Sequence, residues 1–389
     1  MHSSRLALGL VLCLVVRPLS AANAFTVLHS FDGADGDGSF ATPVFDAAGN
    51  MYGTTELGGA GFGTVFKLAP DGTFSTLYAF QGGEDGTGPT GSLVVDGAGN
   101  IYGTTSGGGN LCTAINKSGC GTVYKIAPDG SETVLHAFTG GADGYAPTGG
   151  VVADGAGNLY GNTLFGGATA CGEGCGTIYR IAPDGTETIL HTFTGSADDG
   201  AYPLGTLLID RKGNIYGTTS KGGSAQDYGT VFGLSKNGAE KILYVFQGGS
   251  DGEYPEAGLV RDRTGNLFGT TASGGSYQGG TAFKLAPDGT ETILHSFSTL
   301  DSDMPLPGGG ALVLDGHGNL FGTCVGTHSG SRGIVFELLP GGTEQVLHVF
   351  SKAKGHDPAG GLTARNGRLF GTTLQGGPSN MGVVYALHE

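Results

Sequence analysis

One repeated phrase constrains the fold more than any other feature of the chain. Residues 121–138 read GTVYKIAPDGSETVLHAF, and nearly the same phrase returns at 176–193 and at 280–297. The N-terminal part carries only the second half of the phrase, VLHSF at 27–31, and the C-terminus carries only the first half, GVVYALHE at 382–389. An array with a half-repeat at each end is expected to close into a ring, because an open solenoid needs polar capping repeats at both ends.

Each repeat contains four short runs in a fixed order. The first is a small-residue run that ends in Asp-x-x-Gly-Asn, as in GSLVVDGAGN at 91–100, and the second is Tyr/Phe-Gly-Thr/Asn-Thr/Cys. The third resembles Gly-Thr-Val-Phe and the fourth Val-Leu-His-x-Phe, and each of the last three runs occurs seven times. The aromatic residues that open the second run are Tyr52, Tyr102, Tyr160, Tyr216, Phe268, Phe321 and Phe370.

These runs have the composition of β-strands. They are rich in β-branched and aromatic residues, and Gly, Pro, Asp or Asn bounds each of them. Pro-Asp-Gly between the third and fourth runs, and Asp-x-x-Gly-Asn between the first and second, are tight-turn signals that predict hairpins. Four antiparallel strands in every repeat of roughly 50 residues are typical of a propeller blade. The sequence therefore predicts an all-β fold, a seven-bladed β-propeller with four antiparallel strands per blade.

The half-repeats predict how the ring closes. If the four runs of each blade are arranged from the axis outward, the last blade lacks its outermost strand. Residues 25–31 would supply that strand and pair beside 382–388, so that no open sheet edge remains between the first and last blades. We therefore expect 25–389 to form a single propeller domain.

The first 24 residues have the pattern of an export signal. A positive charge in MHSSR precedes the apolar run LALGLVLCLVV, and Ala22-Asn23-Ala24 is an A-x-A cleavage site. The apolar run has about half of the roughly 20 residues that a membrane-spanning helix needs. No other stretch is apolar enough to cross a bilayer, so the sequence predicts a secreted or periplasmic protein without a membrane span.

The charge balance excludes one class of partner. The chain carries 34 acidic against 19 basic side chains, a net charge of −15, and removal of Arg5 and Arg17 with the signal makes it more negative. Such a surface repels phosphate backbones, so we expect no nucleic-acid binding. Cations, basic proteins and neutral glycans remain compatible with it, as does a charge that serves only solubility.

Four cysteines bracket two short loops. Cys112 and Cys120 flank one loop and Cys171 and Cys175 the other, and the second cysteine of each pair directly precedes the third run. In an exported chain, two local disulfides are the expected arrangement. A zinc site is the alternative, although no second CxxC or nearby histidine pair supports it. Cys324 stands where other repeats carry threonine.

The combined phrases also resemble a known repeat. GTVFKLAPDGT-like and ETVLHAF-like runs, together with GNLYGTT-like runs, are similar to the GloVer tandem repeat of bacterial choice-of-anchor surface or secreted proteins. The resemblance covers nearly all of 25–389. It implies a propeller-like secreted array, and it transfers no catalytic residue.

Candidate ligand-binding residues follow from the position of the loops. The second-to-third loops and the blade-to-blade crossings share one face, which we call the loop-bearing face, and ligands of propellers are expected there. The crossings carry an aspartate in regular register, and a ring of carboxylates could bind Ca²⁺ or a cationic ligand. Gly-x-Asp-Gly is also ordinary turn chemistry, in which the carboxylate accepts hydrogen bonds from its own backbone. These residues are Asp35, Asp85, Asp143, Asp199 and Asp251.

Histidines offer a weaker indication of catalysis. The fourth-run histidines recur around the ring and are replaced by Tyr78 and Tyr244, which indicates packing with a polar tip. Residues that occur once are better candidates, and His328, His356 and Asp357 fall on the expected loop-bearing face. No nucleophile motif such as G-x-S-x-G accompanies them, so no catalytic residue and no metal site is assigned.

The sequence thus favours a binding or scaffolding module, expected to be a monomer, for a glycan, peptide or partner protein. The alternative is a secreted enzyme, a lyase or hydrolase that acts on a polysaccharide or a lactone-like substrate. A ring with no specific ligand is a third hypothesis.

Overall fold

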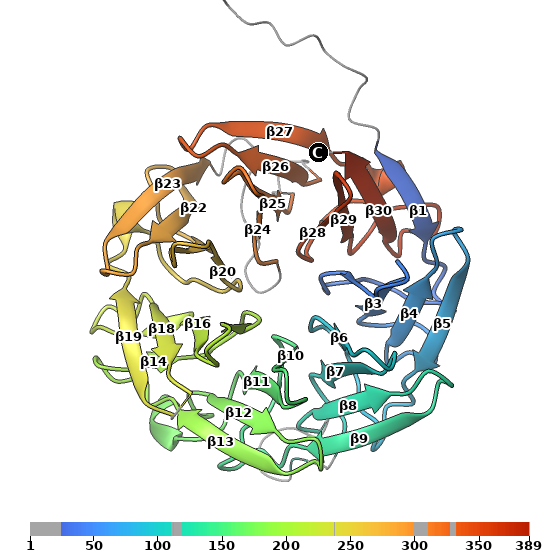
Figure 1. Ribbon diagram of the computed structural model, residues 1–389, viewed down its shortest axis with the longest axis horizontal. Coiled ribbons are helices and arrows are strands. Elements are labelled where there is room, and N and C mark those ends of the chain that lie inside the picture. Colours follow the sequence, from blue (N-terminus) through green and yellow to red (C-terminus); the bar gives the residue numbers. More distant parts are fainter. Residues whose placement is uncertain are drawn as a thin grey trace, which may run out of the picture.

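The computed structural model describes residues 25–109, 112, 119–236, 238–298, 310–326 and 332–388. The expected export signal, residues 1–24, lies outside these ranges, as does His328. Within the described part, seven four-stranded antiparallel sheets are arranged like blades around a central axis (Figure 1). The seven-bladed propeller predicted from the repeats is confirmed.

In every blade the four runs of the repeat form four strands in the order expected, from the axis to the rim. Blade 1 consists of β2 (Val44–Phe45), β3 (Met51–Thr55), β4 (Thr64–Leu68) and β5 (Phe74–Ala79). Blade 2 consists of β6 (Val94–Val95), β7 (Ile101–Thr105), β8 (Thr122–Ile126) and β9 (Glu132–Ala137). Blade 3 consists of β10 (Val152–Ala153), β11 (Leu159–Thr163), β12 (Thr177–Ile181) and β13 (Glu187–Thr192).

The second half of the ring repeats this pattern. Blade 4 consists of β15 (Leu208–Ile209), β16 (Ile215–Thr219), β18 (Thr230–Leu234) and β19 (Glu240–Val245). Blade 5 consists of β20 (Val260–Arg261), β21 (Leu267–Thr271), β22 (Gln278–Leu285) and β23 (Glu291–Ser298). Blade 6 consists of β24 (Val313–Leu314), β25 (Leu320–Cys324), β26 (Ile334–Leu338) and β27 (Glu344–Val349).

Blade 7 is built from both ends of the chain. It consists of β28 (Thr363–Arg365), β29 (Arg368–Thr372), β30 (Val383–His388) and, at its outer edge, β1 (Thr26–Ser30). Val27 pairs with Tyr385 and His29 with Val384, so the first strand lies antiparallel to the last. The predicted closure is therefore confirmed, and it leaves no open sheet edge between blades 7 and 1.

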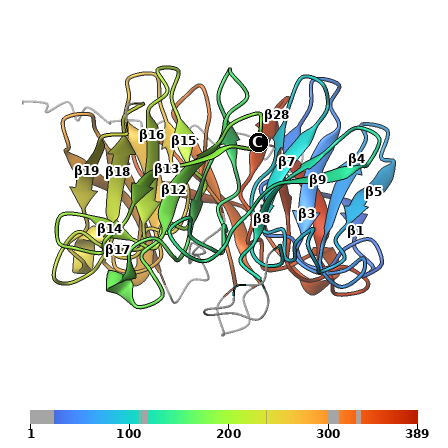
Figure 2. The ribbon, with the colours of Figure 1, turned by 90° about the horizontal axis from the view of Figure 1, so that it is seen from below.

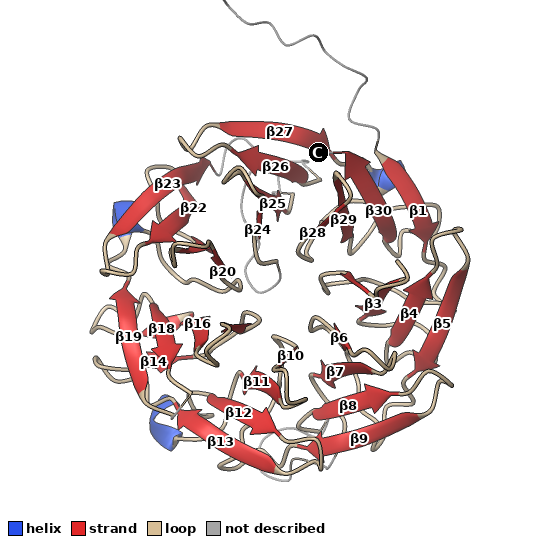
Figure 3. Ribbon diagram, viewed as in Figure 1, coloured by secondary structure: helices blue, strands red, loops and turns tan. Residues whose placement is uncertain are grey.

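Short elements outside the blades decorate the ring. A two-stranded sheet joins β14 (Gly200–Ala201) to β17 (Lys221–Gly222) at the bottom of Figure 2, which is the loop-bearing face. Three single-turn 3₁₀ helices lie near the periphery (Figure 3): Thr169–Cys171, Gly249–Asp251 and Lys352–Lys354. No helix in the described ranges is both long and apolar enough to cross a membrane.

The hydrophobic core lies between neighbouring blades. Tyr52, Val65 and Phe80 of blade 1 pack with Leu93 and Tyr124 of blade 2 in one buried cluster. Glycine in the second strand makes room for the ring on the third. A Cβ on Gly53 would lie 2.5 Å from the ring of Phe66, which explains why glycine follows the Tyr or Phe of the second strand in each blade.

Buried threonine pairs join the second and third strands at their loop-bearing ends. The hydroxyls of Thr55 and Thr64 lie 2.8 Å apart, and Thr64 also donates to the Asp35 carbonyl in the crossing. Equivalent pairs occur in blades 2 to 5: Thr105–Thr122, Thr163–Thr177, Thr219–Thr230 and Thr271–Thr281. In blade 6 the opposed residues are Cys324 and Ile334. Both side chains are buried, and Ile334 has no hydroxyl with which a threonine at position 324 could form a hydrogen bond.

Candidate functional site

The crossing aspartates and the fourth-strand histidines or tyrosines, which the sequence suggested separately, meet in each of five blades. His29 Nε2 lies 2.6 Å from an Asp35 oxygen, and the Tyr78 hydroxyl donates to Asp85 over 3.0 Å. The remaining pairs are His136–Asp143, His191–Asp199 and Tyr244–Asp251. Each pair stands at the outer strand of its own blade, so the five carboxylates are spread around the rim and do not converge on one ligand.

The same carboxylates hold the crossing backbone. Asp85 accepts hydrogen bonds from the backbone N–H groups of Gln81 and Gly83, at 2.7 and 3.2 Å. Asp199 accepts from the N–H and hydroxyl of Thr194. Burial works to raise the pKa of Asp199, but hydrogen bonds from His191 and Thr194 outweigh it and lower that pKa. These contacts are the turn chemistry that the Gly-x-Asp-Gly pattern allowed.

The aspartates of Asp-x-x-Gly-Asn are also held internally. Asp96 accepts hydrogen bonds from the Asn100 side chain and backbone and from the Tyr102 hydroxyl, at 2.7, 2.9 and 3.1 Å. Burial would raise the pKa of Asp96, but the Asn100 and Tyr102 hydrogen bonds lower it. This network locks the turn between the first two strands and leaves little capacity for an external ligand.

His356 and Asp357 form a pair in the last crossing. His356 Nδ1 lies 2.8 Å from an Asp357 carboxylate oxygen, and the Asp357 N–H donates to the Arg332 carbonyl. Asp357 has a φ of 56°. Residues at the same place in other crossings, such as Ala146 and Tyr202, also have φ near +60°. The register position of the crossing aspartates is instead filled by Lys354, because Gly355 is the counterpart of Gly36. The pair therefore sits at a turn position, and His328, the third catalytic candidate, lies outside the described residues.

The two predicted disulfides are present, and the structure shows what they do. Cys112 bonds Cys120, and Cys171 bonds Cys175. Their sulfurs cover crossing glycines: Cys120 lies against Gly140, and Cys171 against Gly195. In blades 1 and 4 the residue directly before the third-strand glycine covers the same point, as Phe62 does over Gly82. The disulfides thus take the place of an aromatic side chain at the base of each loop.

A hollow lies on the loop-bearing face between blades 1 and 2. It has a volume of about 870 Å³, and much of its wall is backbone, because seven of its thirteen lining residues are glycines. Phe62 and Leu57 present apolar surface there and are 39% and 49% exposed. Glu56, Glu84 and Thr87 supply oxygen atoms, and burial together with the nearby Asp37 carboxylate raises the pKa of Glu56.

This hollow can bind a ligand that has both apolar and hydrogen-bonding faces. Exposed apolar side chains beside a few polar groups are typical of ligand sites. None of its lining residues is basic, so it does not suit an anion. The sequence analysis chose this face but did not single out Phe62 or Leu57. The signal that could have found Phe62 is an aromatic residue where two other blades carry cysteine.

Comparisons with solved structures find the same architecture in proteins of distant sequence. The chain aligns with the extracellular domain of a protein assigned as a one-component system of B. thetaiotaomicron at 11% identity and a TM-score of 0.56, covering 92% of this chain and 39% of that one. It aligns with PorZ, a surface component of the type-IX secretion system of Porphyromonas gingivalis, at 15% identity and a TM-score of 0.53, covering 92% and 47%. A luciferin-regenerating enzyme aligns at 13% identity and a TM-score of 0.47, covering 95% and 96%. At these identities the likeness concerns the fold alone.

Sequence comparisons give a family but no characterised relative. No curated protein matches the chain. The Gloeobacter/Verrucomicrobia repeat matches it over residues 14–173 and 112–324, and together these two segments span most of the sequence. The chain therefore belongs to the Gloeobacter/Verrucomicrobia repeat family.

Proposed function

We propose that the protein is an exported ligand-binding module and that a neutral glycan binds in the hollow between blades 1 and 2. The observation that carries the proposal is the exposed pair Phe62 and Leu57 beside Glu56 and Glu84 in a glycine-walled hollow. Export is supported by the pattern of residues 1–24 and by the two local disulfides, which form in oxidising compartments.

A glycan fits the chemistry of these residues. A sugar ring has an apolar C–H face that packs on an aromatic ring, and its hydroxyls donate to carboxylates and carbonyls. Glycine walls leave backbone N–H and C=O groups accessible to the ligand. The net charge of −15 disfavours polyanions, so a neutral chain is preferred to an acidic one.

The test is binding of neutral oligosaccharides to the purified chain, first on an array and then by calorimetry. Phe62→Ala should weaken binding about tenfold or more, because a buried aromatic contact contributes roughly 1.4 kcal/mol or more. Tyr277→Ala is the matched control, since Tyr277 is an aromatic residue of a loop in blade 5, is 64% exposed and does not line the hollow. Equal affinities of wild type and Phe62→Ala for a bound glycan would overturn the proposed site.

A further inference from the structure

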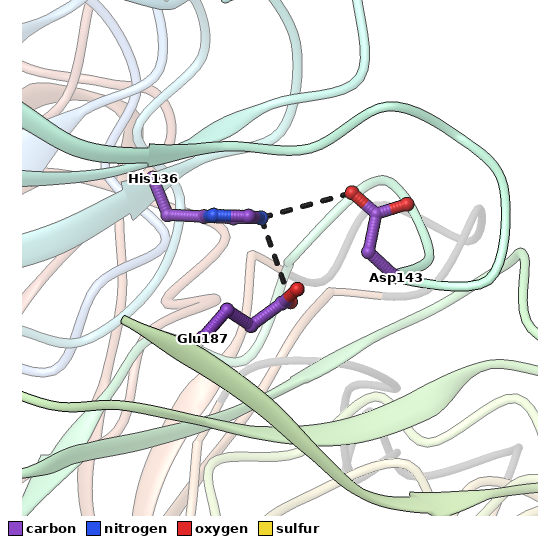
Figure 4. Close-up of side chains that lie close together, drawn as sticks. All are labelled: His136, Asp143 and Glu187. Carbon is purple, nitrogen blue, oxygen red and sulfur yellow. Dashed lines mark ion pairs between the residues drawn. The ribbon is translucent and has the colours of Figure 1, made fainter. Parts of the chain in front are cut away.

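A side-chain contact recurs at the rim between successive blades. A histidine near the end of one fourth strand contacts the first residue of the next blade's fourth strand, as His29 contacts Phe74 and His295 contacts Glu344. At the interface of blades 2 and 3, that contact joins His136 of β9 to Glu187 of β13, and Asp143 of the crossing completes a group of three (Figure 4). The sequence analysis grouped the histidines and the crossing aspartates but did not consider Glu187.

The three side chains converge without hydrogen bonding to one another. His136 Nε2 lies 3.7 Å from Asp143 and 3.5 Å from Glu187, beyond the roughly 3.2 Å of a good N–H···O bond. Nε2 and Glu187 Oε1 are both buried and have no hydrogen-bond partner. The three atoms that could bind a metal ion, one from each side chain, lie within 4.8 Å of one another. Buried polar atoms that face each other unpaired indicate a bound water or ion between them.

We propose that His136, Asp143 and Glu187 bind a divalent first-row transition metal, with Zn²⁺ as its representative. Tetrahedral ligands at about 2.0–2.2 Å from Zn²⁺ stand about 3.3–3.6 Å apart, which is close to the 3.7 and 3.5 Å that separate His136 Nε2 from the two carboxylates. Two carboxylates and a neutral imidazole match the charge and donor type that such an ion takes. The three side chains are 19%, 13% and 16% exposed, so solvent can reach a fourth position. Ca²⁺ fits less well, because it needs six or more oxygen ligands.

Neighbouring groups already orient two of the three ligands, Asp143 and His136. Asp143 accepts hydrogen bonds from the Thr139 N–H and hydroxyl at 2.8 and 2.6 Å, which fix its carboxylate. The Phe138 ring meets the His136 imidazole edge-on, with centroids 4.8 Å apart. Contacts of this kind hold metal ligands in place and preserve affinity. A metal here would also connect the outer strands of two blades.

The other blades supply natural comparisons. His191, Asp199 and Glu240 repeat the group at the next interface, but His191 lies 3.1 Å from Asp199, which already accepts from Thr194 and Gly200. That group is therefore expected to bind the metal more weakly. In blades 1 and 4 the histidine is replaced by Tyr78 and Tyr244, whose hydroxyls donate to aspartate. Tyrosine thus satisfies the carboxylate without an ion, and His136→Tyr is a substitution that the fold accommodates elsewhere.

The experiment is a Zn²⁺ titration of the chain without a histidine tag, after treatment with chelator. We expect saturable binding that raises the melting temperature and that His136→Tyr or Glu187→Gln weakens at least about tenfold. His191→Tyr should leave the tighter binding intact. Anomalous scattering at the zinc edge should place the ion between β9 and β13.

Two results would overturn the proposal. One is the absence of saturable Zn²⁺ binding by the wild type, and the other is binding that neither His136→Tyr nor Glu187→Gln changes. Melting temperatures of the variants in chelator that are no lower than that of wild type establish that a loss of binding is not a loss of fold. The metal site does not depend on the proposed glycan site, so His136→Tyr should leave any glycan affinity unchanged.

Discussion

The imidazole of His29 lies flat on the ring of Phe74, with centroids 3.6 Å apart and planes inclined by 6°. His348 stacks on Phe25 in the same manner, at 3.9 Å and 6°. These two contacts lie at the interfaces of blade 7 with blades 1 and 6. Blade 7 is the blade assembled from both chain ends. At the equivalent place the other interfaces have glutamate, for example Glu132 and Glu187. The closing blade is therefore held by apolar stacks where its neighbours have carboxylates.

Loss of one stack should weaken the ring. Phe74→Ala removes the contact with His29 and with Phe66, and we expect the free energy of unfolding to fall by about 1–2 kcal/mol. Urea denaturation measures the loss. Tyr277→Ala removes an aromatic ring at a more exposed position and should change stability by less than about 0.5 kcal/mol. Equal losses in the two variants would show that the stack does not stabilise the interface.

The glutamate interfaces should make stability depend on pH. Burial, and then the nearby Asp85 carboxylate, raise the pKa of Glu132 from 4.5 to about 7. At a pH below the unfolded-state pKa of 4.5, Glu132 is protonated in both the folded and the unfolded chain, and it has no effect on the pH dependence of stability. As pH rises from 4.5 to 7 the unfolded chain loses the proton first, so Glu132 increasingly destabilises the fold, and the full cost is present above the folded value.

Glu132→Gln should remove that cost. We expect the variant to be more stable than wild type by roughly 1 kcal/mol near pH 8, with the difference vanishing near pH 4, after allowance for the partial exposure of the site. Urea denaturation at both pH values measures it. Glu84→Gln removes a carboxylate at an exposed position and is the control. A gain in stability that is the same at both pH values would contradict this account.

The fold could be predicted from the sequence because the order of the runs indicates how the ring closes. VLHSF at 27–31 is a fourth run with no third run before it. GVVYALHE at 382–389 is a third run with no fourth run after it, so the two together make one complete pair of outer strands. The group of His136, Asp143 and Glu187 could not be predicted in the same way. It depends on how the end of one outer strand approaches the start of the next, which is a matter of blade packing. The hollow at Phe62 depends likewise on two loops from different blades.

Removal of the first strand should open the ring. A chain that lacks residues 25–31 loses the pairing of Val27 with Tyr385 and of His29 with Val384, and it leaves β30 as an open edge. We expect loss of a single cooperative melting transition and self-association visible by size-exclusion chromatography. A peptide of sequence FTVLHSF added in trans should restore the transition by strand addition, and a scrambled peptide should not. A truncated chain that melts like the full one would contradict closure by β1.

The turn aspartates should be structural elements whose contribution is lost in acid. Asp96 accepts from the N–H groups of Ala98 and Asn100 as well as from the Asn100 amide and the Tyr102 hydroxyl, and Asp96→Ala leaves these donors unpaired. We expect a loss of about 1–2 kcal/mol at neutral pH. Although burial opposes it, hydrogen bonding lowers the pKa of Asp96 below 3.8, so its stabilisation is present above the unfolded value and declines as pH falls through the folded one. The difference between variant and wild type in urea denaturation should therefore shrink toward pH 3.

Asp129→Ala, in an exposed turn where the carboxylate bonds only Ser131, should have a smaller effect. An Asp96→Ala loss that is constant down to low pH would mean that the carboxylate charge has no part in holding the turn.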